Sequence, residues 1–204
     1  FGDLSAGRYQ TSGCSSSTRG VTMGGDTGSV SSVIDFITMA SQGNAIDYGD
    51  LIQAIEQTAC TSNSVKGFSS GGSTGSDINT IQNIVINNGG TATDFGDLLF
   101  AVDQGSSTSN SHGGLNDGYQ GTRPLPFNEA GGDRLIRYMG NDGSSNFTDV
   151  GFLTISTDGN ENDFGDALTG SGSQVDGMGN KTRALFSGSA PAVANIDYLT
   201  FSTK

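Results

Sequence analysis

The side chains in this sequence that could carry chemistry are few and far apart. The only histidine, His112, stands in the small-residue run NSHGG, and the two cysteines, Cys14 and Cys60, lie far from it in the sequence. A lone histidine cannot build a histidine-based metal site, and it serves a Ser-His-Asp relay only with partners brought to it in space. We therefore expect no enzymatic activity, no catalytic residue and no metal or other cofactor, and we expect His112 to line a central channel.

The acidic run DGNEND at 158–163 is the nearest approach to a metal-binding motif. It spaces Asp158, Asn160 and Asn162 at alternate positions, as the start of a calcium-binding loop does. The twelfth position of such a loop, normally a glutamate, would be Thr169. An Asx-rich turn is therefore the favoured interpretation.

The composition limits the partners that the chain can bind. Its 204 residues carry nine Lys and Arg against 21 Asp and Glu, a formal net charge of −12, and they include 33 glycines. Such an acidic surface repels the phosphates of nucleic acids, so we expect no nucleic-acid partner. No apolar run approaches the roughly 18 residues that a membrane-spanning helix needs, so we expect no insertion into a membrane.

A short signature recurs along the chain and indicates how the remaining residues are organised. It reads FGDL at 1–4, IDYGDL at 46–51, TDFGDL at 93–98 and NDFGDA at 162–167. Its aromatic residue stands at positions 1, 48, 95 and 164, so two intervals are 47 residues long and the third is 69. We expect the aromatic residue to pack between neighbouring modules. The glycine, which lacks a Cβ atom, permits a bulge or the close approach of another backbone.

Each repeat also contains one strongly apolar burst. These bursts are VIDFITM (33–39), TIQNIVI (80–86), DVGFLTI (149–155) and NIDYLTF (195–201). On a strand, Ile34 and Phe36 would face one way and Ile37 and Met39 the other, so both faces are apolar and each small sheet needs a neighbour on both sides. In the same alignment Cys14 and Cys60 fall one position out of step, which predicts two buried free thiols.

These patterns predict an all-β fold in which residues 1–204 form a single β-propeller domain. It would be built from four approximately 47-residue repeats, one for each of four blades. The segment FGDL at 1–4 would be the fourth strand of the blade that ends with NIDYLTF, so that the N- and C-terminal strands of one blade close the ring. An open β-solenoid or a sandwich is the alternative architecture.

The longer third interval predicts an insertion in blade three at residues 120–147. The second strand of that blade is expected earlier, at LNDGY (115–119), and DRLIRYMGNDG within the insertion reads as a short hairpin. The insertion carries a basic and aromatic patch on an acidic body, a candidate docking surface for another copy or an acidic partner. The residues of this candidate patch are Arg123, Arg134, Arg137 and Tyr138. An insertion that the fold tolerates and that has no function is an equally good explanation.

The amino-acid sequences of the repeats resemble those of known families. The order of a small-residue strand, GVTMGG, VIDFIT and AIDYGDL is similar to a kelch-type blade. The stretches CSSSTRGV (14–21), SNSHGGL (109–115) and GNAIDYGDL (43–51) resemble repeats of kelch-like virion structural proteins from marine, cyanobacterial tailed phages. This resemblance covers nearly the whole chain apart from about residues 120–147, and it implies a location in the virion or outside the cell.

Two functions are compatible with these observations. The first is a non-enzymatic structural component of a virus particle, at the capsid or tail. It would act through protein–protein contacts with other virion proteins or with copies of itself. The alternative is a carbohydrate-binding propeller for attachment to a host, in which Asn, Asp and Tyr side chains would bind a surface glycan. Tyr119 and Tyr138 would then take the place of the tryptophan that the chain lacks.

Overall fold

Strands and turns make up all of the structure that the computed structural model describes. It describes residues 1–110, 133–168 and 173–202, and in these ranges it contains no helix. The strands form four antiparallel sheets, three with four strands and one with three.

Blade one contains β1 (Ser12–Ser15), β2 (Arg19–Met23), β3 (Val33–Thr38) and β4 (Ile46–Asp50). Blade two contains β5 (Ala59–Ser62), β6 (Lys66–Ser70), β7 (Thr80–Val85) and β8 (Thr93–Asp97). Blade three contains β9 (Ser106–Ser109), β10 (Arg134–Asn141), β11 (Asn146–Thr154) and β12 (Asn162–Asp166). Blade four contains β13 (Asp176–Gly179), β14 (Arg183–Ser187) and β15 (Ile196–Thr200).

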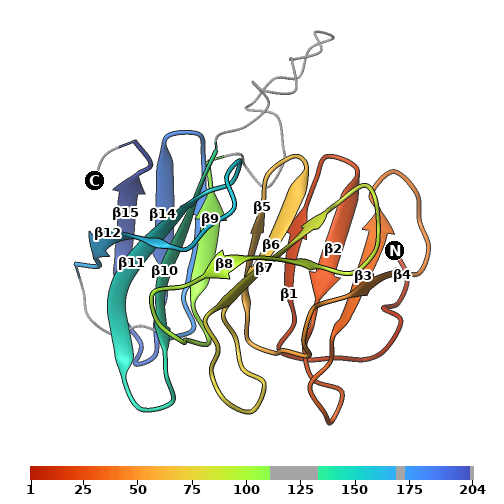
Figure 1. Ribbon diagram of the computed structural model, residues 1–204, viewed down its shortest axis with the longest axis horizontal. Coiled ribbons are helices and arrows are strands. Elements are labelled where there is room, and N and C mark those ends of the chain that lie inside the picture. Colours follow the sequence, from red (N-terminus) through yellow and green to blue (C-terminus); the bar gives the residue numbers. More distant parts are fainter. Residues whose placement is uncertain (111–132, 169–172, 203–204) are drawn as a thin grey trace, which may run out of the picture.

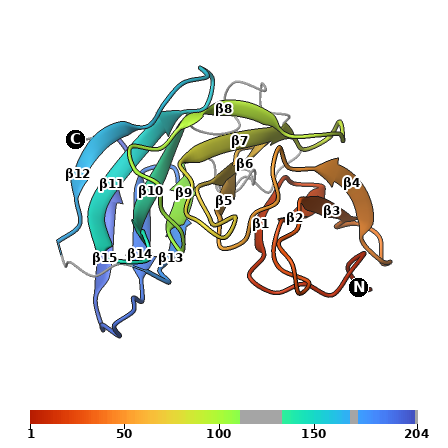
Figure 2. The ribbon, with the colours of Figure 1, turned by 60° about the horizontal axis from the view of Figure 1, so that its bottom comes forward.

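The four sheets are arranged as a four-bladed β-propeller, which confirms the predicted fold. They follow one another in chain order (Figure 1). The first strands β1, β5, β9 and β13 lie on the inner side of the arrangement, and β4, β8 and β12 lie on the outer side (Figure 2). Neighbouring inner strands contact one another in sequence, β1 with β5, β5 with β9 and β9 with β13.

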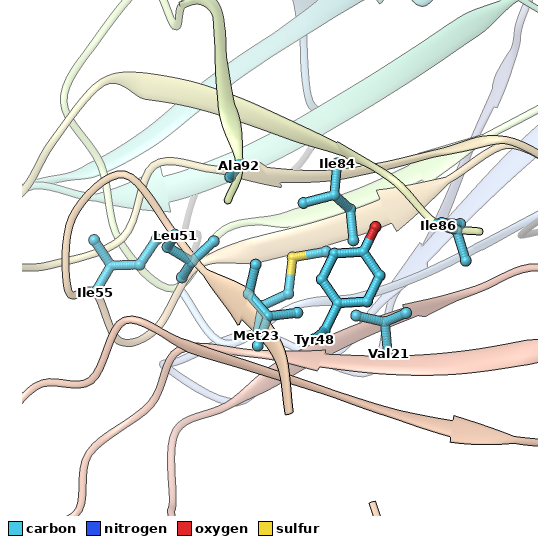
Figure 3. Close-up of a cluster of buried hydrophobic side chains, with 9 residues drawn as sticks. Val21, Met23, Tyr48, Leu51, Ile55, Ile84, Ile86 and Ala92 are labelled. Carbon is cyan, nitrogen blue, oxygen red and sulfur yellow. The ribbon is translucent and has the colours of Figure 1, made fainter. Parts of the chain in front are cut away.

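The hydrophobic core is divided among the junctions between blades. In the first junction, Val21 and Met23 of blade one meet Ile84 and Ile86 of blade two, with the Tyr48 ring among them (Figure 3). Phe95 and Phe164 are buried in the same way at the second and third junctions. The prediction that the aromatic residue of the signature packs between neighbouring modules is therefore confirmed for Tyr48, Phe95 and Phe164, whereas Phe1, in the first copy, is 73% exposed.

The glycine of the signature lies where two backbones come close together. Gly49 and Gly96 have φ angles of 141° and 151°, which disfavour residues with a Cβ atom. A Cβ atom on Gly49 would lie 2.5 Å from the carbonyl oxygen of Gly90, and one on Gly96 would lie 2.3 Å from that of Gly159. The ladders between the third and fourth strands of blades one to three also shift register beside this glycine. Both expectations for the glycine, a bulge and a close backbone approach, are therefore met.

The predicted sharing of the last blade by the two chain ends is not observed. Within the described residues β15 pairs with β14 alone, so the sheet of blade four has three strands. The N-terminal segment lies instead against blade one, where the Asp3 carbonyl accepts a hydrogen bond of 2.8 Å from the Ala45 amide. The two chain ends lie at opposite ends of the row of blades (Figure 1).

The insertion in blade three lies earlier in the chain than predicted. Residues 134–141, expected to form part of a separate hairpin, are strand β10, which pairs with both β9 and β11. This strand takes the second position of the blade, which the sequence had suggested for residues 115–119. The extra residues therefore fall between β9 and β10, and the segments 115–119 and 120–132 lie outside the described residues.

Candidate functional site

The inner strands surround a groove of about 360 Å³ that is lined mainly by small residues. Serine hydroxyl groups in this region bond from one blade to the next. Ser62 Oγ donates to the Ser15 carbonyl oxygen at 2.7 Å, and Ser109 Oγ donates to the Ser62 carbonyl oxygen at 2.6 Å. These hydroxyl groups therefore hold adjacent blades together, which gives the small-residue runs of the sequence a structural role.

A second set of hydrogen bonds recurs at the residue that follows the signature in the sequence. After three of the four copies of the signature, the backbone amide of the next residue donates to a polar side chain of the blade that follows in the chain. The three pairs are Ser5 with Asp35 at 3.2 Å, Ile52 with Gln82 at 2.8 Å, and Leu99 with Glu161 at 2.9 Å. All three acceptor side chains are buried. A buried acceptor that receives a hydrogen bond escapes the cost of lost hydration. The first pair therefore fixes the N-terminal segment on blade one, and the other two fix blade one on blade two and blade two on blade three.

The acceptor at the third position comes from a different strand. Asp35 and Gln82 stand on the third strand of their blades, where blade three has Gly151. Glu161 reaches into the space above this glycine, since a Cβ atom on Gly151 would lie 1.9 Å from Glu161 Oε1. The small residue and the long side chain thus compensate for each other.

The buried Glu161 carboxylate is neutralised by Arg137. Arg137 Nε donates to Glu161 Oε1 at 2.7 Å, its Nη1 donates to the Met139 carbonyl oxygen at 2.8 Å, and its Nη2 also pairs with Asp149. The side chains of Arg137 and Glu161 are 1% and 0% exposed. The arginine therefore satisfies two carboxylates inside the protein.

These positions contradict the predicted docking patch. Tyr138 is 2% exposed, stacks on Phe186 with ring centroids 4.0 Å apart, and donates its hydroxyl hydrogen to Asp197. Burial, followed by the hydrogen bond and charge of Asp197, raises the pKa of Tyr138. Because Arg137 and Tyr138 are buried, neither can present its side chain to a partner or a glycan.

The other predicted site residues divide into two groups. Arg134 is partly buried and donates to the carbonyl oxygen of Phe201 in blade four, so it contributes to a junction. Arg123 and His112 lie outside the described residues.

A cationic residue at the start of each second strand is a feature that we did not single out in the sequence. Arg19, in blade one, lies 4.4 Å from the centre of the Phe36 ring and donates to the carbonyl oxygen of Ile86 in blade two at 2.9 Å. In blade three, Arg134 lies 4.6 Å from the centre of the Phe152 ring. Strand register places Lys66 and Arg183 at the same position in blades two and four. The recurrence of Arg or Lys one repeat apart was the available signal.

The letters of a nucleophile motif also occur in the chain but lie in a different structural setting. GFSSG at 67–71 matches G-x-S-x-G, which in hydrolases forms a sharp turn between a strand and a helix. Here Ser69 lies within β6, is buried, and its Oγ atom is 2.8 Å from Oγ1 of Thr58. Ser69 therefore lies on a strand that is hydrogen-bonded to its neighbour, and not at the sharp turn that this motif forms in hydrolases. Among the described residues no group of His, Cys, Asp and Glu side chains could hold a metal ion.

The two cysteines are free thiols, as predicted, and they meet at the first junction. Cys14 comes from β1 of blade one, and Cys60 Sγ, in β5 of blade two, lies 3.9 Å from Met23 Sδ. Desolvation raises the pKa of both thiols, that of Cys60 to about 12. Little reactive thiolate is therefore present at neutral pH.

We expect Cys60 to react with iodoacetamide at pH 7.5 about a thousandfold more slowly than an unfolded cysteine, whose pKa is about 8.5. The rate should rise to the free-thiol value in denaturant. Peptide-resolved mass spectrometry of the alkylated protein measures both rates. Alkylation of the folded protein at the free-thiol rate would contradict the burial of this thiol.

No protein-family model matches this chain, and no curated protein is similar to it. The part of the chain that the structure describes contains no helix with the length and hydropathy of a membrane span.

Proposed function

We propose that the chain is a non-enzymatic structural component of a virus particle that acts through protein–protein contacts. One observation carries this proposal. Several buried polar groups bond from one blade to the next, whereas apolar side chains such as Met39 and Tyr198 remain exposed at the two ends of the row of blades. Such a distribution suits a module whose role is to be joined to other protein surfaces. The resemblance of the repeat sequences to those of phage virion proteins supports a location in a virus particle.

The proposal is tested by quantitative mass spectrometry of gradient-purified particles of the virus that encodes the chain. We expect the protein at a fixed copy number relative to the major capsid protein, retained after high-salt washing. Absence of the protein from particles, or a source gene outside any virus or prophage, would overturn the proposal. Saturable binding to a glycan array by the purified chain would instead favour a role in host attachment.

A further inference from the structure

Blade four leaves uncovered the face that a following blade covers elsewhere. We call the side of a blade that contacts the next blade along the chain its forward face, and the opposite side its rear face. The forward face of blade four presents four apolar residues that are 59%, 39%, 69% and 62% exposed. They are Met178, Leu185, Ile196 and Tyr198, respectively. Strand register matches Leu185 to Val21 and Ile196 to Ile34 of blade one, which blade two covers to 3% and 0% exposure.

Blade one leaves its rear face uncovered in the complementary way. A groove of about 450 Å³ lies there, lined by Phe1 to Leu4 together with residues that include Gly20, Ile37 and Ala45. At the same positions in blade two, Gly67, Ile84 and Ala92 are buried, and Ile84 and Ala92 pack in the first core cluster. Met39 next to this groove is 40% exposed, whereas its equivalent Ile86 is fully buried. The rear face of blade one is thus the surface against which a preceding blade would pack.

The N-terminal segment already occupies the position of the last strand of such a preceding blade. The Asp3 carbonyl accepts the Ala45 amide at 2.8 Å, just as the Asp50 carbonyl accepts the Ala92 amide at 2.8 Å. The Asp3 amide in turn donates to Asn44 Oδ1 at 3.1 Å. Blade one therefore holds a fourth strand that lacks a third strand beside it. Within residues 1–110, 133–168 and 173–202, blade four has the third strand β15 and lacks a fourth.

We propose that two copies of this chain associate head to tail, with the forward face of blade four packed on the rear face of blade one of the second copy. The Phe1–Leu4 segment of the second copy would lie beside β15, and its Phe1 ring would take the place that Tyr48 has in the first junction. This inference deepens the proposed function, on which its biological meaning rests, by naming the partner as a second copy. The contact is heterologous, so it produces a closed ring or an open chain of copies.

Arg183 supplies a specific polar contact for this junction. Its guanidinium group lies 5.5 Å from the centre of the Tyr198 ring. In the first and third junctions the equivalent arginine, lying over its aromatic ring, donates to the carbonyl oxygen of Ile86 or Phe201. The matching acceptor on the rear face of blade one is the carbonyl oxygen of Met39. Arg183 of one copy is therefore expected to donate to Met39 of the other.

The test begins with the oligomeric state of the purified chain, measured by sedimentation velocity. We expect species larger than the 20.8 kDa monomer. Ile196→Glu on the forward face and Met39→Glu on the rear face should each weaken association at least about a hundredfold, because the junction would desolvate an unpaired charge. Ile46→Glu is the matched control, since Ile46 is 58% exposed on β4 and lies in neither proposed contact surface.

Mixing the two variants separates the proposed contact from a symmetric one. The Met39→Glu chain keeps an intact forward face and the Ile196→Glu chain keeps an intact rear face, so an equimolar mixture should form dimers although each variant alone does not. A dimer of either variant alone, or a wild-type chain that stays monomeric at its highest soluble concentration, would overturn the inference. Incorporation of a monomeric chain into particles would overturn the inference and leave the proposed function intact. Self-association without incorporation would do the reverse.

Discussion

Replacing Arg137 with methionine should lower the free energy of unfolding by about 3–5 kcal/mol, the usual loss when one partner of a buried ion pair is removed. The physical reason is the environment of Glu161, whose side chain is fully buried between blades two and three. Of the donors that the structure describes, only the Leu99 amide would still donate to this carboxylate in the variant. Methionine fills much of the space of the arginine, so the loss reports mainly the uncompensated charge. A loss of this size is a large fraction of the stability of an ordinary domain, about 5–15 kcal/mol.

The measurement is equilibrium denaturation in urea, with fluorescence and circular dichroism as parallel probes. The matched control is the double variant Arg137→Met/Glu161→Gln, which removes the charge and keeps an acceptor for the Leu99 amide. Gln82 already performs this role at the preceding junction, so the double variant should regain most of the lost stability. A deficit below about 1 kcal/mol in the single variant, as for an exposed ion pair, would contradict the assignment of a buried pair.

Replacing Gly96 with alanine should destabilise the protein by about 3 kcal/mol, because two costs add. The φ angle of 151° is unfavourable for alanine, a cost of roughly 1–3 kcal/mol. The new Cβ atom would also lie 2.3 Å from the Gly159 carbonyl oxygen, a backbone atom that cannot turn aside. That approach is fixed by the hydrogen bond from the Gly159 amide to the Phe95 carbonyl oxygen at 2.9 Å. Relieving the clash separates blades two and three, with an overpacking cost of about 1–3 kcal/mol.

Gly165 provides the matched control within the same molecule. It occupies the same place in the signature and has a similar φ angle of 136°, but a Cβ atom there would meet no described atom within 4 Å. Gly165→Ala should therefore show only the backbone cost, about 1 kcal/mol. Thermal and urea denaturation of the two variants side by side measure the difference. Equal losses would show that the close approach of the two blades contributes nothing.

The repeated parts of the fold could be predicted from the sequence because each repeat encodes them locally. The apolar bursts predicted strands buried on both faces, and in blade two TIQNIVI contains β7, with Ile81 buried in one junction and Ile84 in the other. In VIDFITM, by contrast, Ile34 is buried whereas Met39 is 40% exposed. The signature predicted an aromatic residue between blades and a glycine under a close backbone, and Phe95 and Gly96 have these roles. Such features depend on residue type and spacing alone, so they recur wherever the same residues recur at the same spacing.

The candidate site was less predictable because its residues depend on neighbours that are distant in the chain. Arg137 and Tyr138 looked like a basic and aromatic surface, yet pairing of their strand with both β9 and β11 places them inside blade three. The buried acceptor that satisfies Arg137 is Glu161, which lies just before the outer strand β12, and no local pattern links the two. In blade three, Gly151 stands where blades one and two have an acceptor side chain, and Glu161 supplies the acceptor instead. This compensation is visible only in the tertiary structure.

The sequence by itself determined that the chain is all-β, that it has four similar modules, and which aromatic and glycine residues lie between them. These properties follow from periodicity and from the conformational range of single residues. Tertiary structure decided which strand fills the second position of blade three and which charged side chains are buried. It also decided that Phe1–Leu4 lies on blade one while no described strand pairs with the second edge of β15. Strand pairing across long separations is a competition among alternative partners, and it is settled by the packing of whole blades rather than by the residues of one segment.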